Sequence, residues 1–186
     1  KNKCAMSKLD KMFAIQWYGP FSFGTDDCYE NLRDWEQKHP DERGFCIYYI
    51  YGKPPQKKKG RSYIGITLNK NGVVSKRYSN DMSHKIHQLR DKEVWVGRFA
   101  DKHKHSRKDS ELCESLLIAY LDPELNIKKK KFYPDGNVAL INRWYTKDAK
   151  PRQRRTYEVQ KLVPDIIICD DEGIWVSEQL LQGQKF

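Results

Sequence analysis

Long apolar segments are missing from this chain. No apolar run approaches the roughly 20 residues that a membrane-spanning helix requires, and the first residues, Lys1-Asn2-Lys3-Cys4-Ala5, contain no apolar signal segment. Internal repeats and long low-complexity tracts are also missing. These absences favour a folded protein that neither crosses nor enters a membrane.

Cysteine is scarce and unpatterned. The five cysteines are odd in number and include no C-x-x-C pair, which argues against a disulfide framework and against a structural zinc site. A reducing compartment is the simplest interpretation, so we expect a cytoplasmic protein.

Positive charge is in excess. Lysine and arginine together number 35 against 25 aspartate and glutamate residues, a formal net charge of +10. Such an excess suits a polyanion, and the usual one is nucleic acid, although lysine runs can also be simple solvated loops. The basic residues cluster at 57–59, at 128–131 and at Arg152, Arg154 and Arg155.

Hydrophobic periodicity and turn signals predict the order of elements. We expect one helix to begin at Asp26 or Asp27 and another to be capped by Ser106 with Asp109 and to end before Pro123. A further helix is predicted over 75–89. The predicted strands cover 12–18, ended by Gly19-Pro20, then 44–51 and 61–68 as an antiparallel hairpin, 94–99, 157–163, 165–169 and 174–176.

Two tyrosine-bearing strands and three later polar residues form the most informative pattern. Tyr48 and Tyr63 lie in neighbouring predicted strands and are followed by Arg77, Glu114 and Asn126. Alternate side chains of a strand share one face, so the two phenols can lie on one surface. Two phenols, a guanidinium and a carboxylate suit phosphodiester chemistry, as proton acceptor, phosphate clamp and metal anchor.

At these residues the chain resembles the GIY-YIG nuclease family over about residues 44–128. Cys46-Ile47-Tyr48 stands where the first family triplet should be, and Tyr63-Ile64-Gly65 reproduces the second. Arg77 and the Glu114 helix with Pro123-x-x-Asn126 follow in the family's order. The chain departs from the family at Cys46, which replaces a glycine, and in an insertion at 53–60. Reading Gly44-Phe45-Cys46 as the first triplet would remove the tyrosine.

The resemblance implies an α+β fold, in which a small antiparallel three-stranded sheet is flanked by helices. It also implies three parts of the chain. We expect an N-terminal strand-helix arm at 1–43, a nuclease core at 44–128, and a β-rich extension at 129–186 that packs on the core.

The resemblance also implies catalytic roles. Tyr48 would accept a proton from the attacking water, although the residues alone do not separate it from Tyr49 or Tyr51. Tyr63 would hydrogen-bond the water or the scissile phosphate, and Arg77 would clamp that phosphate. Glu114 would anchor one Mg²⁺ or Mn²⁺ per active site.

Supporting roles fall on residues around these four. Gly65 would let the backbone approach the substrate because it lacks a Cβ atom. Asn126 would fix backbone near the site. His84 or its helical neighbour His87 would contact phosphate or protonate the leaving oxygen, and Glu111 rivals Glu114 as the metal ligand. Lys128 and Lys129 would grip the flanking DNA backbone.

Together these inferences predict a metal-dependent DNA endonuclease. The alternative is a non-catalytic nucleic-acid-binding module that keeps the nuclease fold, for which the departure at Cys46 is the support. A site-specific double-strand cut needs two active sites, which is compatible with a homodimer but does not establish one.

Overall fold

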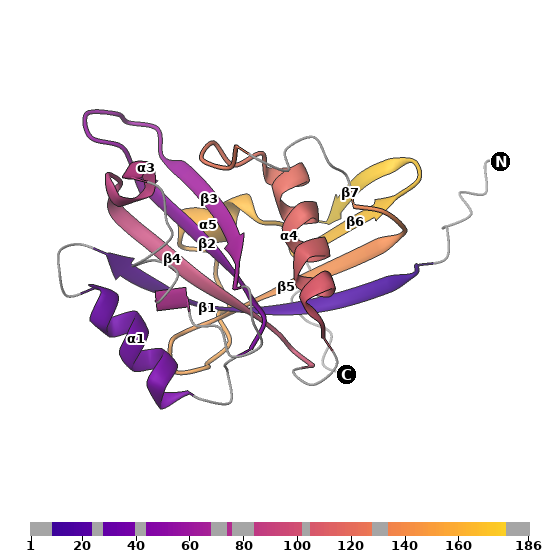
Figure 1. Ribbon diagram of the computed structural model, residues 1–186, viewed down its shortest axis with the longest axis horizontal. Helices are drawn as coiled ribbons and strands as arrows, with labels where there is room; N and C mark the ends of the chain where they lie inside the picture. The colour runs from indigo at the N-terminus through magenta and orange to yellow at the C-terminus, as the bar shows by residue number, and fades with distance from the viewer. Residues whose placement is uncertain are drawn as a thin grey trace.

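The computed structural model describes residues 9–23, 28–39, 44–67, 74–75, 84–101, 105–127 and 134–177. Its centre is one curled, mixed sheet of seven strands in the order β3-β2-β4-β1-β5-β6-β7 (Figure 1). The strands are β1 (Lys11–Phe23), β2 (Cys46–Lys53), β3 (Arg61–Ile66), β4 (Arg90–Phe99), β5 (Val138–Tyr145), β6 (Ile166–Asp170) and β7 (Gly173–Ser177). The helices are α1 (Cys28–Lys38), α3 (His84–His87), α4 (Arg107–Leu121) and α5 (Glu158–Leu162).

The predicted fold class, a small three-stranded sheet flanked by helices, is wrong. Strands β3, β2 and β4 are antiparallel neighbours, but the sheet continues through β1. The strand predicted near the N-terminus is central, because β1 pairs with β4 on one side and in parallel with β5 on the other. This parallel pairing adds β5, β6 and β7 to the same sheet.

Two apolar faces make the core, as the period of two along a buried strand requires. On one, which we call the α1 face, Tyr48 and Val96 pack with Leu32 and Trp35 of α1. On the other, the α4 face, Tyr49 and Trp95 pack with side chains of α4 and α5. Burying a large apolar side chain stabilises the fold by about 1.5–3 kcal/mol, so both faces hold their helices to the sheet.

Helix α4 begins and ends at local sequence signals. Ser106 is its N-cap, and a capping box joins the Ser106 and Asp109 side chains to each other's backbone. The helix ends at Asp122, which adopts a left-handed conformation just before Pro123. This helix was predicted at the correct position.

Other elements correct the sequence-based predictions. Strand β1 continues past Gly19-Pro20 to Phe23, with a register shift between Tyr18 and Phe21. The strand predicted over 157–163 is wrong, because Glu158–Leu162 is a helix whose Val159 is buried on the α4 face. Strand β5 was not predicted at all. Of the helix predicted over 75–89, the structure describes Ser75 and residues 84–89, and in the latter range α3 ends at His87.

The predicted division of the chain at residues 43 and 128 stays a prediction. Within the ranges that the structure describes, no helix combines the length and the apolar character needed to cross a membrane.

Candidate functional site

Tyr48 and Tyr63 lie on the α1 face of the sheet, side by side. In the antiparallel pairing of β2 with β3, Tyr48 is opposite Gly65 and Ile50 is opposite Tyr63. The two phenol rings are 6.1 Å apart between centroids and inclined by 35°. Tyr48 is 1% exposed, whereas Tyr63 is partly exposed. The structure therefore brings the two predicted phenols together on one surface.

Gly65 makes room for the Tyr48 ring. A Cβ atom at position 65 would lie 2.5 Å from both the hydroxyl oxygen and Cζ of Tyr48. The phenol of Tyr48 thus lies across β3 and directs its hydroxyl end over Gly65. Any larger residue at position 65 would displace this phenol, because real Cβ atoms do not approach other heavy atoms so closely.

Tyr49 and Tyr51 are not equivalent to Tyr48. Both point to the opposite side of β2, because successive side chains of a strand alternate, and Tyr49 belongs to the core of the α4 face. Burial raises the pKa of Tyr49 to about 12 despite a hydrogen bond with Ser62. Among these three tyrosines, only Tyr48 shares a face with Tyr63.

Glu114 lies on the buried side of α4 and is 7% exposed. The helix runs beside β3 in the opposite direction (Figure 1) and packs on the α4 face through Cys113 and Leu117. Glu114 and Ile118 are one turn apart and share a flank of the helix. The phenols lie on the other face of the sheet. The Glu114 carboxylate and the phenols could therefore act on one substrate only around the outer edge of β3, the edge strand of the sheet. Their convergence stays a prediction.

Segment 124–126, directly after α4, covers the outer edge of β3. The Asn126 side chain accepts a hydrogen bond from Ile64 N (2.9 Å) and donates one to Ile64 O (2.8 Å). Leu125 N donates to Ser62 O, and Glu124 accepts from Ser62 N and Oγ. An open strand edge is thereby closed. Asn126 therefore fixes the backbone of the strand that carries Tyr63 and Gly65, and its part in an active site stays a prediction.

Four predicted site residues are not described at the level of their side chains. Arg77, Lys128 and Lys129 lie outside the described residues, and for His84 only its place in α3 is described. His87, its alternative, lies at the end of α3 and is exposed.

A metal site at Glu114 would have one protein carboxylate. Among the described side chains, no group of three or more His, Cys, Asp or Glu residues could hold a metal ion. Mg²⁺ keeps most of its water ligands and binds through one or two carboxylates together with substrate phosphate. A single buried carboxylate fits such an ion, and it does not fit a zinc cage.

The basic clusters differ in whether their charged groups have partners within the protein. Arg152 donates to Gly19 O and Tyr145 O, and its guanidinium lies 5.5 Å from the Trp95 ring and 5.0 Å from the Tyr157 ring. Arg155 is paired with Asp165. These two arginines therefore hold the chain after β5 in place rather than forming an open basic surface.

The lysines at 57–59, by contrast, are exposed at the tip of the β2–β3 hairpin, and Lys59 is only 3.9 Å from Glu124 while its side chain stays 92% exposed. The hairpin is formed by the two strands that carry Tyr48 and Tyr63. Because these lysines are exposed, whereas Arg152 and Arg155 have partners within the protein, the hairpin tip is the better candidate for binding a polyanion.

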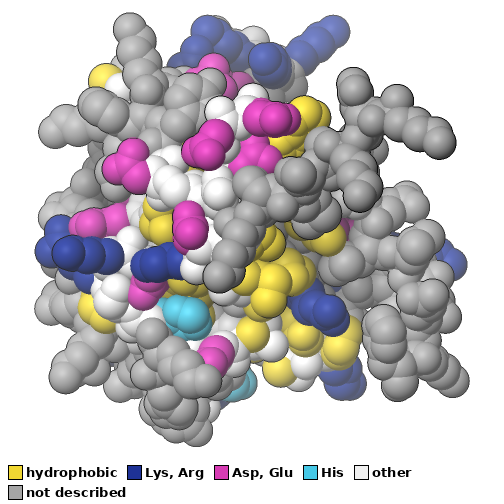
Figure 2. Space-filling model, turned by 90° about the vertical axis from the view of Figure 1, so that its right-hand side faces the viewer, with side chains coloured by type: hydrophobic (Ala, Val, Ile, Leu, Met, Phe, Trp, Pro, Cys, Tyr) yellow, Lys and Arg dark blue, Asp and Glu magenta, His cyan; other side chains and the backbone are white. Residues whose placement is uncertain are grey.

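Figure 2 shows the side of the molecule that lies to the right in Figure 1. Side chains of both charges mix with apolar ones on this side, so its charge does not favour a polyanion.

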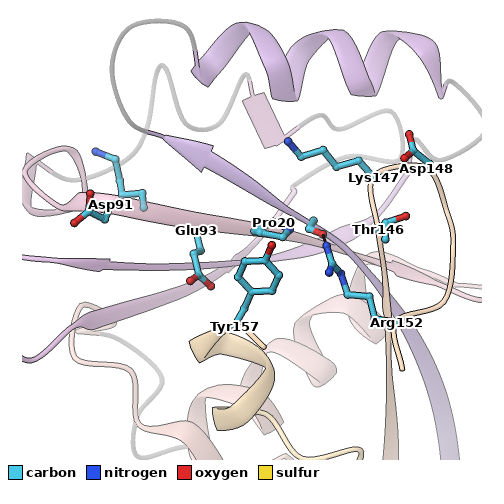
Figure 3. A pocket seen from close by; sticks show the side chains of 10 residues that line it. Pro20, Asp91, Glu93, Thr146, Lys147, Asp148, Arg152 and Tyr157 are labelled. Atoms are coloured by element: carbon cyan, nitrogen blue, oxygen red, sulfur yellow. Dashed lines mark hydrogen bonds between the residues drawn. The ribbon is translucent and has the colours of Figure 1, made fainter. Parts of the chain in front are cut away.

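A pocket of about 590 Å³ lies away from the Tyr48–Tyr63 pair and is lined in part by Arg152. Its lining includes Gly19 and Pro20 of β1 and Thr146 just after β5, and none of the predicted site residues lines it. In Figure 3 Tyr157 lies between Glu93 and Arg152. Burial raises the pKa of Glu93. Acidic and basic side chains alternate around the opening, so charge selects no ligand class there.

One polar cluster on the α1 face was not foreseen. Glu36, Ser75 and Arg98 are all buried there, although each comes from a different part of the chain. No sequence signal marks Glu36, since a single glutamate in an amphipathic helix is usually solvated.

The comparisons with known proteins add no assignment: no family model, no curated protein and no solved structure matches this chain. The resemblance to the GIY-YIG family accordingly stays a prediction based on the residues quoted for it.

Proposed function

We propose that this chain is a metal-dependent DNA endonuclease whose proton acceptor is Tyr48. The observation that carries the proposal is the Tyr48–Tyr63 pair, with ring centroids 6.1 Å apart and the Tyr48 hydroxyl over Gly65. The absence of a Cβ atom at Gly65 lets the Tyr48 phenol lie on β3, on the same face of the sheet as Tyr63.

The proposed chemistry is hydrolysis of a phosphodiester bond by water. Tyr48 takes a proton from the attacking water as the new P–O bond forms, and the P–O bond to the leaving oxygen breaks. Tyr63 hydrogen-bonds the water or a non-bridging oxygen, and Arg77 neutralises the charge that develops on the phosphate. A bound divalent cation would polarise the phosphate and stabilise the leaving oxygen. Glu114 would hold that cation.

The pKa of a phenol sets a condition on this proposal. The reference value is near 10, so a phenol can act as a proton acceptor near neutral pH only if a nearby positive charge stabilises the phenolate. An arginine and a metal-bound substrate next to the hydroxyl would lower its pKa by favouring the phenolate.

The test is cleavage of supercoiled plasmid DNA by the purified chain with Mg²⁺ or Mn²⁺. We expect nicking by the wild-type protein and its loss in Glu114→Gln and Arg77→Ala. Glu111→Gln is the matched control. Glu111 lies on the same helix and its carboxylate pairs with Arg107 at an exposed position, so this variant should cleave normally. Activity unaffected by both Glu114→Gln and Arg77→Ala would remove these residues from the mechanism.

A second candidate is a nucleic-acid-binding module without catalysis. The burial of Tyr48, at 1% exposure, favours it, because a buried phenol can serve packing alone. Salt-sensitive DNA binding without cleavage by any divalent cation would support this second candidate.

A further inference from the structure

A row of apolar side chains crosses four neighbouring strands of the sheet. Strand pairing sets its members opposite one another from β1 to β5, β6 and β7, and they are Met12, Ala139, Ile168 and Trp175. Residues that are directly opposite in neighbouring strands project from the same face. Met12 is 66% exposed and Trp175 is 53% exposed, so within the part of the chain that the structure describes the row is open at both ends.

A second row lies two residues further along the strands, on the same face. It consists of one residue from each of the same four strands, namely Ala14, Ile141, Ile166 and Ser177. Neither row contains a charged residue. The two rows therefore form one uncharged surface of the sheet, which we call the distal patch.

The distal patch belongs to neither part of the described core. Met12 and Ala14 project to the same side of β1 as Tyr18, and Tyr18 packs on Trp35 of α1, with ring centroids 5.4 Å apart. The patch thus lies on the α1 face, but α1 lies at the opposite end of the sheet from β6 and β7 (Figure 1). None of its residues is among the described side chains that form the core of either face. A continuous apolar surface of this kind is typical of a protein–protein contact.

Trp175 is held in place although it is exposed. Its indole Nε1 donates to Asp170 Oδ1 at 3.1 Å, and the same oxygen accepts from Glu172 N and Gly173 N in the turn between β6 and β7. Tryptophan is enriched among the residues that contribute most to binding. Because this ring is already ordered, a partner that covers it would lose little side-chain entropy there.

Opposite charges flank the distal patch at the two ends of its strands. At one end lie Asp170 of β6 and Asp10, which precedes β1 and donates its N–H to Asn137 O at 2.8 Å. At the other end lies the exposed Arg143 of β5, on the face of the patch because it is two residues beyond Ile141. In the strand order β1-β5-β6, the arginine is on the strand between the two that carry or adjoin the aspartates.

We propose that the distal patch binds a second copy of this chain in a twofold-symmetric dimer, whose axis lies in the contact plane and runs across the strands. Such an axis reverses the strand direction between the copies and preserves the strand order. The acidic end of each patch then faces the basic end of the other, with Arg143 of one copy over the strand position between Asp10 and Asp170. An axis along the strands would bring the acidic ends together, so charge favours the first arrangement. This inference does not depend on the proposed nuclease function.

Side-chain size is complementary in the same arrangement. Each row faces the other row of the second copy, strand by strand, so a large side chain meets a small one on β1, β5 and β7. These pairs are Met12 with Ala14, Ile141 with Ala139, and Trp175 with Ser177. A twofold contact requires a surface that is complementary to itself. The patch meets this requirement in both charge and size, which favours a second copy over a different protein.

The test is the mass of the full chain in solution, measured by sedimentation equilibrium over a range of concentrations. We expect a reversible equilibrium between monomer and dimer. Met12→Lys should raise the dissociation constant about tenfold or more, because it places a charge in an apolar contact. Leu162→Lys is the matched control. Leu162 is also an exposed apolar side chain, at 45%, but it lies in α5, so this variant should dimerise normally.

A charge reversal tests the orientation of the two copies. Arg143→Glu should weaken the dimer about tenfold, because like charges would then face each other. Adding Asp10→Arg should restore part of the affinity, since the two altered positions meet across the contact. Contact with a different protein would show no such rescue. Circular dichroism should confirm that every variant remains folded.

Three results would overturn the proposal. The first is a chain that stays monomeric at every concentration, which would leave residues 178–186 or another protein as the occupant of the patch. The second is a dimer that persists in both Met12→Lys and Arg143→Glu, because the contact would then lie elsewhere, for example at the outer edge of β7. The third is a charge reversal that Asp10→Arg does not rescue. None of them would change the expectation for plasmid nicking.

Discussion

The hydroxyl of Tyr48 lies over Gly65 on the neighbouring strand, so close that a methyl group at position 65 would be 2.5 Å from the oxygen. The glycine of Tyr63-Ile64-Gly65 is needed where the tyrosine of Cys46-Ile47-Tyr48 crosses β3.

Gly65→Ala should displace the Tyr48 phenol and lower the rate of plasmid nicking about 100-fold, since small misplacements of a reacting group have effects of that size. Gly60→Ala is the matched control. A Cβ atom there would lie 2.2 Å from the Tyr51 ring, on the opposite face of β2 from Tyr48. Circular dichroism should show that both variants remain folded. Equal loss of activity in the two would contradict the role of Tyr48.

Tyr48→Phe should lower the cleavage rate by a factor of about 100 to 10,000, as expected for loss of a general base, and Tyr49→Phe should leave it unchanged. Tyr49 lies on the α4 face, and burial raises its pKa to about 12, so its phenol stays protonated when Tyr48 must act. Single-turnover rates of the two variants under the same conditions are the measurement. A larger loss of rate in Tyr49→Phe than in Tyr48→Phe would indicate that the proton acceptor lies on the α4 face of the sheet.

Acid should destabilise the protein partly through Asp109. Burial raises its pKa, but hydrogen bonds from Lys11 and Ser106 outweigh burial and lower the pKa from 3.8 to about 2. A depressed pKa in the folded state contributes stability that is present above about pH 3.8 and is lost as the pH falls through about 2. In Asp109→Asn, the free energy of unfolding should depend less on pH in this window, as measured by urea titration.

Lys11→Met provides the complementary variant for Asp109. Without the 2.9 Å contact from Lys11 Nζ, the Asp109 pKa should rise toward its ordinary value, so the loss of stability should begin at a higher pH. An unchanged pH profile in both variants would show that this pair does not contribute to acid sensitivity.

Lys57, Lys58 and Lys59 should contribute to DNA affinity through the phosphate backbone. Replacing all three with alanine should weaken DNA binding at low salt. The slope of log affinity against log salt should become shallower by about 0.9 for each phosphate that the variant no longer neutralises. Fluorescence anisotropy with a labelled duplex at several salt concentrations is the measurement. If the salt dependence of the affinity is the same in the variant and the wild type, DNA binds elsewhere on the protein.

Local sequence signals predicted several elements correctly. The Ser106–Asp109 capping box and Pro123 bound α4, and the β-rich composition of 44–51 and 61–68, on either side of the basic loop, predicted the β2–β3 hairpin. The phenol pair followed from the alternation of side chains between the two faces of a strand. In each of these cases the determining contacts lie within a few residues, or between two strands joined by one short loop.

Contacts between distant segments decided the rest. Strand β5 forms because it pairs with Lys11–Tyr18, more than a hundred residues earlier, and residues 158–162 became a helix because Val159 is buried against the sheet. Neither partner is visible in the local pattern, since strand propensity depends on the neighbours that a segment meets.

By itself, the sequence determined which residue types are available for phosphate chemistry, the two tyrosine strands and the helix that bears Glu114. Only the tertiary structure decided that Tyr48 rather than Tyr49 shares a face with Tyr63, that Gly65 lies beneath it, and that Glu36 is buried and accepts a hydrogen bond from Val74 N. The physical reason is that the face of a strand residue and the burial of a charge depend on pairing register and packing, which join segments far apart in the chain.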